Sequence, residues 1–260
     1  MRLAGLLRGL VPARLRRALA VAIRTRSAAR RVRRQPRPDP AAVFGEVYAK
    51  GIWGASETAF YSGGGSDEHF AAPYCEAVRA YVDAAEIERP MIVDLGCGDF
   101  RVGQRLMTDW AADYVGVDVV PALVEHNEQV HAGQNVRFVC SDVVTDELPA
   151  GDVCLVRQVF QHLSNDEILR VLGKLERYPH VIVTEHYPAD ELTAIPNLDK
   201  VPGADTRLSE NSGVYIDKPP FSRRIRPLLA VDSNPGEIRT FALVRDYRPI
   251  RAKISAKRWS

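Results

Sequence analysis

Residues 91–103, which read MIVDLGCGDFRVG, constrain the fold of this chain more than any other segment. The apolar run 91–93 predicts a β-strand, Asp94 ends it, and Gly96 and Gly98 predict a tight turn before a helix. Glycines let the backbone approach a ligand across the end of the strand, where the next helix also offers free N–H groups. The segment therefore predicts a strand, a turn and a helix that together seat a nucleotide-type ligand.

Two further strands are predicted to end beside acidic residues. Residues 114–118 (YVGVD) end in Asp118, which lies about 20 residues beyond the glycine turn, the usual spacing of a ribose-binding carboxylate. Residues 136–140 (VRFVC) form a third short apolar run, and Asp142 follows it closely. Three strands that each lead to a carboxylate favour a ligand site over simple packing.

Residues 91–160 resemble the class I S-adenosylmethionine-dependent methyltransferases, whose first motif reads hhDhGCGxG. The resemblance implies that S-adenosyl-L-methionine is the cofactor. One departure from the motif is Phe100, which stands where the family usually has a third glycine. By matching position, the resemblance assigns Asp94, Gly96, Cys97 and Gly98 to the loop beneath the methionine and ribose, Asp118 to the ribose hydroxyls, and Asp142 with Val143 to the adenine.

The remaining apolar runs extend the predicted sheet. Residues 152–160 and 181–183 predict a fourth and a fifth strand, and residues 225–231 and 238–246 predict a terminal hairpin. The fold class expected from these elements is an α/β, Rossmann-like sheet of seven mostly parallel strands, with an antiparallel last strand and helices on both faces. Dinucleotide-binding domains generally lack that antiparallel strand.

The chemistry is expected at the end of the fourth strand, where the resembled class places the transferred methyl group. Arg157 and Gln158 are assigned to the cofactor there. His162 and His186 are the candidate bases, because histidine has a suitable intrinsic acidity to take a proton from an attacking hydroxyl or amine. The alternative for His162 is a structural hydrogen bond between the loop and the start of the next helix.

Residues 188–222 form a long polar stretch without periodicity, and such a segment in a compact enzyme is usually functional. We expect it to help build the acceptor pocket, with Asn197, Arg207 and Tyr215 as substrate contacts; the alternative is a solvated excursion. Together with RQVFQHLSN at residues 157–165, it is similar to a bacterial subgroup of methyltransferases without an assigned acceptor. That subgroup usually has an acid where this chain has Gln158.

Composition limits the chain to one sizeable core, since 46% of its 260 residues are hydrophobic and 26% are charged. We expect a methyltransferase domain over residues 41–250 and a basic tail over residues 251–260. The four cysteines lack CxxC spacing, so we expect no metal site, and reduced, mostly buried thiols favour a cytoplasmic protein.

Residues 1–40 form a basic leader that ends in a proline-rich stretch, residues 35–40 (QPRPDP), which we expect to be a stiff linker. Residues 1–40 hold twelve arginines and one acid, which gives +11, and the net charge of +2 therefore leaves −9 for the rest of the chain. Leucines at helical spacing, such as Leu3, Leu6, Leu7 and Leu10, indicate an amphipathic segment. Three interpretations stay open: contact with an anionic membrane surface by a peripheral protein, a targeting presequence, or a solvated arm. Nucleic acid is disfavoured as a partner, because the charge is confined to the leader and lacks interleaved aromatics.

Residues 62–66 (SGGGS) lie among aromatic residues and are expected to act as a flap over the ligand. The function expected from the whole chain is methyl transfer to an O or N atom of a small hydroxylated acceptor, such as a saccharide or a lipid-linked intermediate. One alternative is an NAD-dependent oxidoreductase, although Asp99, Phe100 and Arg101 do not complete a GxGxxG turn. The other is a non-catalytic, membrane-associated cofactor-binding protein.

Overall fold

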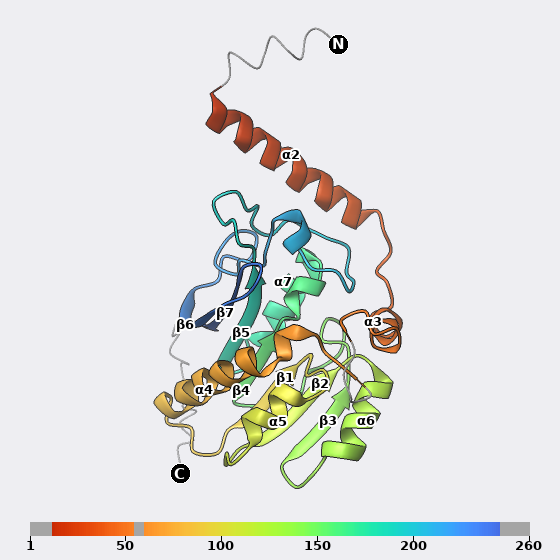
Figure 1. Ribbon diagram of the computed structural model, residues 1–260, viewed down its shortest axis with the longest axis vertical. Coiled ribbons are helices and arrows are strands. Elements are labelled where there is room, and N and C mark those ends of the chain that lie inside the picture. Colours follow the sequence, from red (N-terminus) through yellow and green to blue (C-terminus); the bar gives the residue numbers. More distant parts are fainter. Residues whose placement is uncertain (1–11, 55–59, 245–260) are drawn as a thin grey trace, which may run out of the picture.

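A computed structural model describes residues 12–54 and 60–244 of the chain (Figure 1). Its centre is a seven-stranded sheet with the strand order β3-β2-β1-β4-β5-β7-β6. The strands are β1 (Met91–Leu95), β2 (Asp113–Asp118), β3 (Val136–Cys140), β4 (Val153–Arg157), β5 (His180–Tyr187), β6 (Ile225–Asp232) and β7 (Glu237–Leu243). Strands β1 to β5 pair in parallel, and β7 pairs antiparallel with both β5 and β6. The predicted fold class is confirmed.

Helices cover both faces of the sheet, because neighbouring residues of each central strand point to opposite faces. Ile92 belongs to the apolar cluster beneath α4, α5 and α6, whereas Val93 belongs to the cluster beneath α7. The helices are α2 (Ala13–Arg33), α3 (Pro40–Ala49), α4 (Glu68–Ala84), α5 (Arg101–Met107), α6 (Pro121–His131) and α7 (Asn165–Leu175), with short 3-10 turns η1 (Gly64–Ser66), η2 (Phe160–His162) and η3 (Leu208–Glu210).

The connection from β4 to α7 differs from the sequence expectation. The fourth strand was expected over residues 152–160, but β4 ends at Arg157 because Gln158 takes a left-handed backbone with φ of 56°. The chain then forms η2 and reaches Ser164, whose side chain caps α7 in a capping box with Glu167. This early end of the strand places residues 158–163 in a turn across the edge of the sheet.

Residues 188–222 are irregular, as expected, but they are packed rather than solvated. Asn197 is buried and bridges the segment: its Oδ1 accepts from the Tyr215 N–H at 2.7 Å, and its Nδ2 donates to the carbonyls of Tyr215 and Pro219 at 2.9 and 2.8 Å. Ile195 and Leu198 pack with Ala28 of α2 in a small apolar cluster. The segment therefore joins the sheet to the basic helix.

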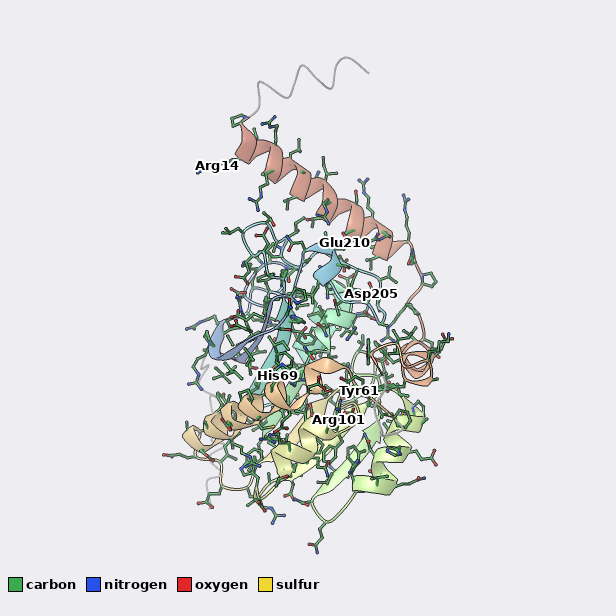
Figure 2. All side chains as sticks on the ribbon, in the orientation of Figure 1. Arg14, Tyr61, His69, Arg101, Asp205 and Glu210 are labelled. Carbon is green, nitrogen blue, oxygen red and sulfur yellow. The ribbon has the colours of Figure 1, made fainter. Side chains whose placement is uncertain are left out.

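Helix α2 lies across the end of the molecule formed by this segment (Figure 1). Arg24 pairs with Glu210 at 2.7 Å, and the labelled Glu210 faces the helix in Figure 2. The side of α2 that faces away from this segment exposes Leu15, Leu19 and Ile23, each more than half accessible to solvent. None of the helices within residues 12–54 and 60–244 is both long and apolar enough to span a membrane. The leucines at positions 3 to 10 lie outside the described residues.

Replacing Asn197 with alanine should lower the free energy of unfolding by about 3 kcal/mol, because one N–H and two carbonyls would lose buried partners. Asn211→Ala is the matched control, since Asn211 also has a positive φ but makes a single exposed side-chain bond to Thr193. Urea unfolding of both variants measures the difference. Equal losses would show that the buried Asn197 contacts do not stabilise the segment.

Candidate active site

The turn after β1 requires glycine at two positions. Gly96 and Gly98 have φ angles of 72° and 56°, in the left-handed region that side chains disfavour. A Cβ on Gly96 would overlap the Val159 side chain, and one on Gly98 would overlap the Ser62 hydroxyl. The backbone of the turn is therefore closely covered by the β4–α7 connection and by the segment before α4.

Phe100, the departure from the family motif, and Asp99, which precedes it, have separate structural roles. Phe100 takes a left-handed backbone with φ of 62° and buries its ring against Tyr114 and Phe138, at centroid distances of 5.1 and 4.9 Å. Asp99 accepts hydrogen bonds from the Ser62 N–H at 3.0 Å and from Arg101 Nε at 2.9 Å. Phe100 thus belongs to the core beneath the turn, and Asp99 ties the turn to the segment above it.

The predicted ligand carboxylates meet at one edge of the sheet. Asp118 ends β2 and accepts from the N–H groups of Gly98 and Val120, both at 3.1 Å. Asp94 lies in β1 and accepts from the Tyr114 hydroxyl at 2.7 Å. Burial raises the pKa of Asp118 and raises that of Asp94 to about 6. Both carboxylates line a common cavity.

Asp142, the predicted adenine contact, is already paired in the structure. Arg37 binds it through two guanidinium nitrogens, at 2.6 and 3.0 Å, and also binds Glu167 at 2.6 Å. Arg37 comes from residues 35–40, which the sequence predicted only as a stiff linker. The linker therefore reaches the far end of the cavity and joins the leader to the site.

The N-terminal segments form a roof over the cavity. Phe44 and Tyr48 of α3 and Trp53 after it all line the cavity, with ring centroids 5.7 to 5.9 Å apart where they meet. The Tyr48 hydroxyl lies 3.0 Å from the Ser62 hydroxyl. Figure 2 shows Arg101 beside Tyr61, with the guanidinium 4.5 Å from the ring centroid. The segment expected to act as a flap is thus bound to the glycine turn through several polar contacts.

Arg157, at the end of β4, is a buried cation with unused hydrogen-bonding capacity. One guanidinium nitrogen donates to the Gly65 carbonyl, and the group lies 5.1 Å from the centroid of the Tyr74 ring. Its Nε atom is buried without a partner. Burial lowers the pKa of Arg157, which means that an anion at this point would be stabilising. Gln158, beside it, also lines the cavity.

The β4–α7 connection also presents Gln161 and His162 to the cavity. His162 Nδ1 lies 3.2 Å from the Gly203 carbonyl, so Nδ1 carries the proton, and the unprotonated Nε2 accepts from Gln161 Nε2 at 3.4 Å. Desolvation lowers the pKa of His162 to about 4, and the ring is therefore neutral at pH 7. Gln161 Nε2 donates to the Gln158 carbonyl at 3.2 Å, which leaves Oε1 buried without a partner.

Two buried ionisable side chains, Glu185 and Arg207, hold this connection in place. The Glu185 carboxylate accepts from the N–H groups of Phe160 and Gln161, at 2.9 and 3.2 Å. Arg207 donates to the carbonyls of Phe160 and Leu163, at 2.9 and 2.7 Å. The sequence did not single out Glu185, because an acid inside a fifth strand gives no signal before its partners are known.

The remaining candidates are less directly placed. His186 lines the cavity, although its Nε2 lies 2.9 Å from the Pro235 carbonyl. Asn197, Arg207 and Tyr215 do not line the cavity, and all three are buried in its supporting layer. Of the cysteines, Cys97 lines the cavity and Cys140 is exposed, contrary to the expectation of mostly buried thiols beside strands.

The lining residues surround one cavity of about 300 Å³. Glycine-turn backbone and carboxylates form one part of it, aromatic rings form its roof, and Arg157, Gln161 and His162 lie at the end of β4. Within the described residues, no group of His, Cys, Asp and Glu side chains is arranged to hold a metal ion. The arrangement fits an elongated, nucleoside-containing ligand with a second ligand beside β4.

Burial raises the pKa of Glu185 to about 8, above its usual 4.5. Between these values the folded chain holds a proton that the unfolded chain has released, so stability should fall as pH rises from 4.5 to 8. Glu185→Gln should reduce this slope by up to about 1.4 kcal/mol per pH unit. Urea unfolding between pH 5 and pH 8 measures it, with exposed Glu147→Gln as the control. An unchanged slope in Glu185→Gln would refute the raised pKa of Glu185.

Comparison with known proteins agrees with this geometry. Residues 92–178 match a family model described as a methyltransferase domain. No curated protein matches the chain by sequence. This family match decides between the methyltransferase and the NAD-dependent interpretations of the sequence in favour of the former.

Solved structures with a similar fold include magnesium protoporphyrin IX methyltransferase from Synechocystis PCC 6803 with bound SAH. It is 15% identical, with 78% of this chain and 94% of that chain covered, at a TM-score of 0.49. N-methyltransferase NodS from Bradyrhizobium japonicum WM9 is 11% identical, with 68% and 97% covered, at a TM-score of 0.46. Likeness at this level says nothing about the acceptor. Residues 92–178 therefore form a methyltransferase domain, which is consistent with a class I S-adenosylmethionine-dependent methyltransferase with S-adenosyl-L-methionine as its cofactor.

Proposed function

We propose that this protein transfers a methyl group from S-adenosylmethionine to an O or N atom of a small hydroxylated acceptor. The observation that carries the proposal is the position of Gln161 and His162, two polar side chains that line the same cavity as the glycine turn. They lie after β4, where the resembled class places the methyl group. Small hydroxylated acceptors include saccharides and lipid-linked intermediates that carry a hydroxyl group.

The residues present fit S-adenosylmethionine along the whole cavity. Gly96 and Gly98 allow close approach of the backbone, and Asp118 has lone pairs left for the ribose hydroxyls. Arg157 has an unpaired buried Nε for the methionine carboxylate. Asp142 and Val143 would meet the adenine, with Arg37 closing that end. Bound there, the cofactor supplies a methyl group on a sulfonium centre.

The protein's own contribution to the transfer is alignment, exclusion of water and removal of a proton. The roof of Phe44 and Trp53 excludes water from the end of β4. His162 accepts the proton of an acceptor hydroxyl on Nε2, where the hydroxyl replaces the contact with Gln161 Nε2, while Nδ1 stays bonded to Gly203. Glu185 and Arg207 hold the turn that carries His162, and we propose that they are positioning residues. His186 is the second candidate base.

The basic leader is proposed to have a role separate from that of the methyltransferase domain. We propose residues 1–40 as a basic leader, residues 41–250 as the methyltransferase domain with its insertion at 188–222, and residues 251–260 as a tail. Helix α2 packs on the insertion through Ala28 and exposes Leu15, Leu19 and Ile23. It holds eight arginines and no acidic residue. This combination suits an anionic membrane surface, which attracts arginines and receives aliphatic side chains.

S-adenosylhomocysteine should bind the full-length protein in isothermal titration calorimetry, whereas NAD and NADP should not. Asp118→Ala should weaken binding by about tenfold or more, because a hydrogen bond to a charged group is lost. Asp113→Ala, at the start of the same strand and paired with Arg89 on the surface, is the matched control and should bind normally. Wild-type affinity in Asp118→Ala would contradict the assigned ribose contact, and failure of the wild type to bind would contradict the function.

In vesicle flotation, the full-length protein should bind vesicles containing phosphatidylglycerol and not vesicles of phosphatidylcholine alone. Replacing Leu15, Leu19 and Ile23 together with glutamine should reduce binding by about tenfold or more, because the insertion of apolar side chains is lost. Val130→Gln is the control, since Val130 is equally exposed on α6. Equal flotation of the triple variant and the wild type would remove the membrane role of α2.

A further inference from the structure

The acceptor part of the cavity differs in chemistry from the cofactor part. We use the term acceptor half for the cavity-lining residues after β4 and the aromatic residues in front of them, namely Phe44, Trp53, Val159, Gln161, His162 and Leu163. None of these six side chains carries a charge at pH 7, since His162 is neutral. The carboxylates that line the cavity lie instead in β1, at the end of β2 and in the turns after β1 and β3. Arg37 is paired with one of these carboxylates.

Aromatic rings form one continuous wall of the acceptor half. The Trp53 and His162 rings lie 5.3 Å apart at an angle of 36°, and the Phe44 ring meets His162 edge-on at 5.6 Å. Phe44, Trp53 and His162 are each partly exposed, so the wall is open to a ligand. Such a wall favours a flat ring that packs on it by stacked or edge-to-face contact.

The unpaired polar atom of the acceptor half is a hydrogen-bond acceptor. Gln161 Oε1 is buried without a partner, and Gln161 as a whole is 8% exposed. The orientation of its amide is fixed by the bond from Nε2 to the Gln158 carbonyl. His162 Nε2 is unprotonated because Nδ1 donates to Gly203, and Nε2 accepts from Gln161 Nε2 at 3.4 Å. The ligand atom at this point must therefore donate a hydrogen bond.

These observations exclude several acceptor classes. A carboxylate or phosphate would find no free cation among the six residues of the acceptor half. A saccharide would bury several hydroxyl groups, yet the acceptor half offers few polar atoms to satisfy them. We infer, on the basis of the proposed function, that the acceptor is an uncharged aromatic or heteroaromatic ring that carries a phenol-type hydroxyl. Gln161 orients this hydroxyl, and His162 receives its proton.

The chemistry of the transfer supports this class. The acceptor oxygen forms a bond to the methyl carbon as the carbon–sulfur bond breaks, and the hydroxyl proton passes to His162 Nε2 and then to water. A histidine whose pKa is lowered to about 4 is a weak base. It accepts a proton far more readily from a phenol, with a pKa near 10 as in tyrosine, than from an aliphatic alcohol.

A matched set of probes tests the inference with full-length protein saturated with S-adenosylhomocysteine. 2-Naphthol is flat, neutral and hydroxylated. Naphthalene lacks the hydroxyl group, and decahydro-2-naphthol lacks the flat ring. The probe 6-hydroxy-2-naphthoate adds a negative charge, and methyl glucoside represents a saccharide. Calorimetry should show 2-naphthol binding about tenfold more tightly than each of the others, since ring packing and one buried hydrogen bond are both required. Tightest binding of the carboxylate or the glucoside, or equal binding of all five, would overturn the inference.

Variants test the assigned residues separately. Trp53→Ala should weaken 2-naphthol binding by about tenfold, while Trp110→Phe, away from the cavity lining, should leave it unchanged. In Gln161→Met, naphthalene and 2-naphthol should bind equally, because the hydroxyl partner is gone. A preserved preference for 2-naphthol in Gln161→Met would contradict the role of Gln161. Binding of S-adenosylhomocysteine without any 2-naphthol preference would refute this inference alone, whereas no binding of S-adenosylhomocysteine would refute the proposed function.

Discussion

The hydrogen bond from the Gly98 N–H to the Asp118 carboxylate ties the turn after β1 to the end of β2, and the rest of the site depends on it. It requires a left-handed glycine, because a side chain at residue 98 would collide with Ser62. It also requires a buried carboxylate, whose cost is offset by two backbone N–H donors. The turn, the Asp118 carboxylate and the roof are therefore fixed by one local geometry.

The N-terminal segments complete the site rather than precede it. Ser62 and Asp99 exchange hydrogen bonds between roof and turn, and Arg37 reaches across to Asp142. Gly65 accepts from the buried Arg157, so the roof also contacts the end of β4. The linker that carries Arg37 follows helix α2 directly along the chain. Any partner that binds the leader is therefore connected to the cofactor end of the cavity by a few residues.

The sequence predicted the sheet well, because each strand carries its own local pattern. The run at residues 136–140 is apolar and bounded by polar residues, and β3 has those same limits. The fourth strand was predicted to end three residues too late, since nothing in QVF at residues 158–160 signals that Gln158 adopts a left-handed backbone. Among the site residues, Asp94, Asp118 and Asp142 were predicted by motif and do line the cavity.

The roles that depend on tertiary contacts could not be predicted. Asn197, Arg207 and Tyr215 have side chains typical of substrate contacts, yet they are buried in the layer that supports the cavity. Conversely, Arg37 lay in a proline-rich linker, and Phe44 and Trp53 lay in a segment with no motif. Their position over the glycine turn follows from packing between segments far apart in the chain. Local periodicity carries no information about such packing.

The central claim is that the cavity holds S-adenosylmethionine with its carboxylate at Arg157. Calorimetric titration of S-adenosylhomocysteine and of its carboxyl methyl ester into the wild type and Arg157→Met tests this claim most directly. The wild type should prefer the free carboxylate by about tenfold or more, and Arg157→Met should bind the two compounds equally, because the buried charged contact is lost. The same preference in both proteins, or no preference in the wild type, would contradict it.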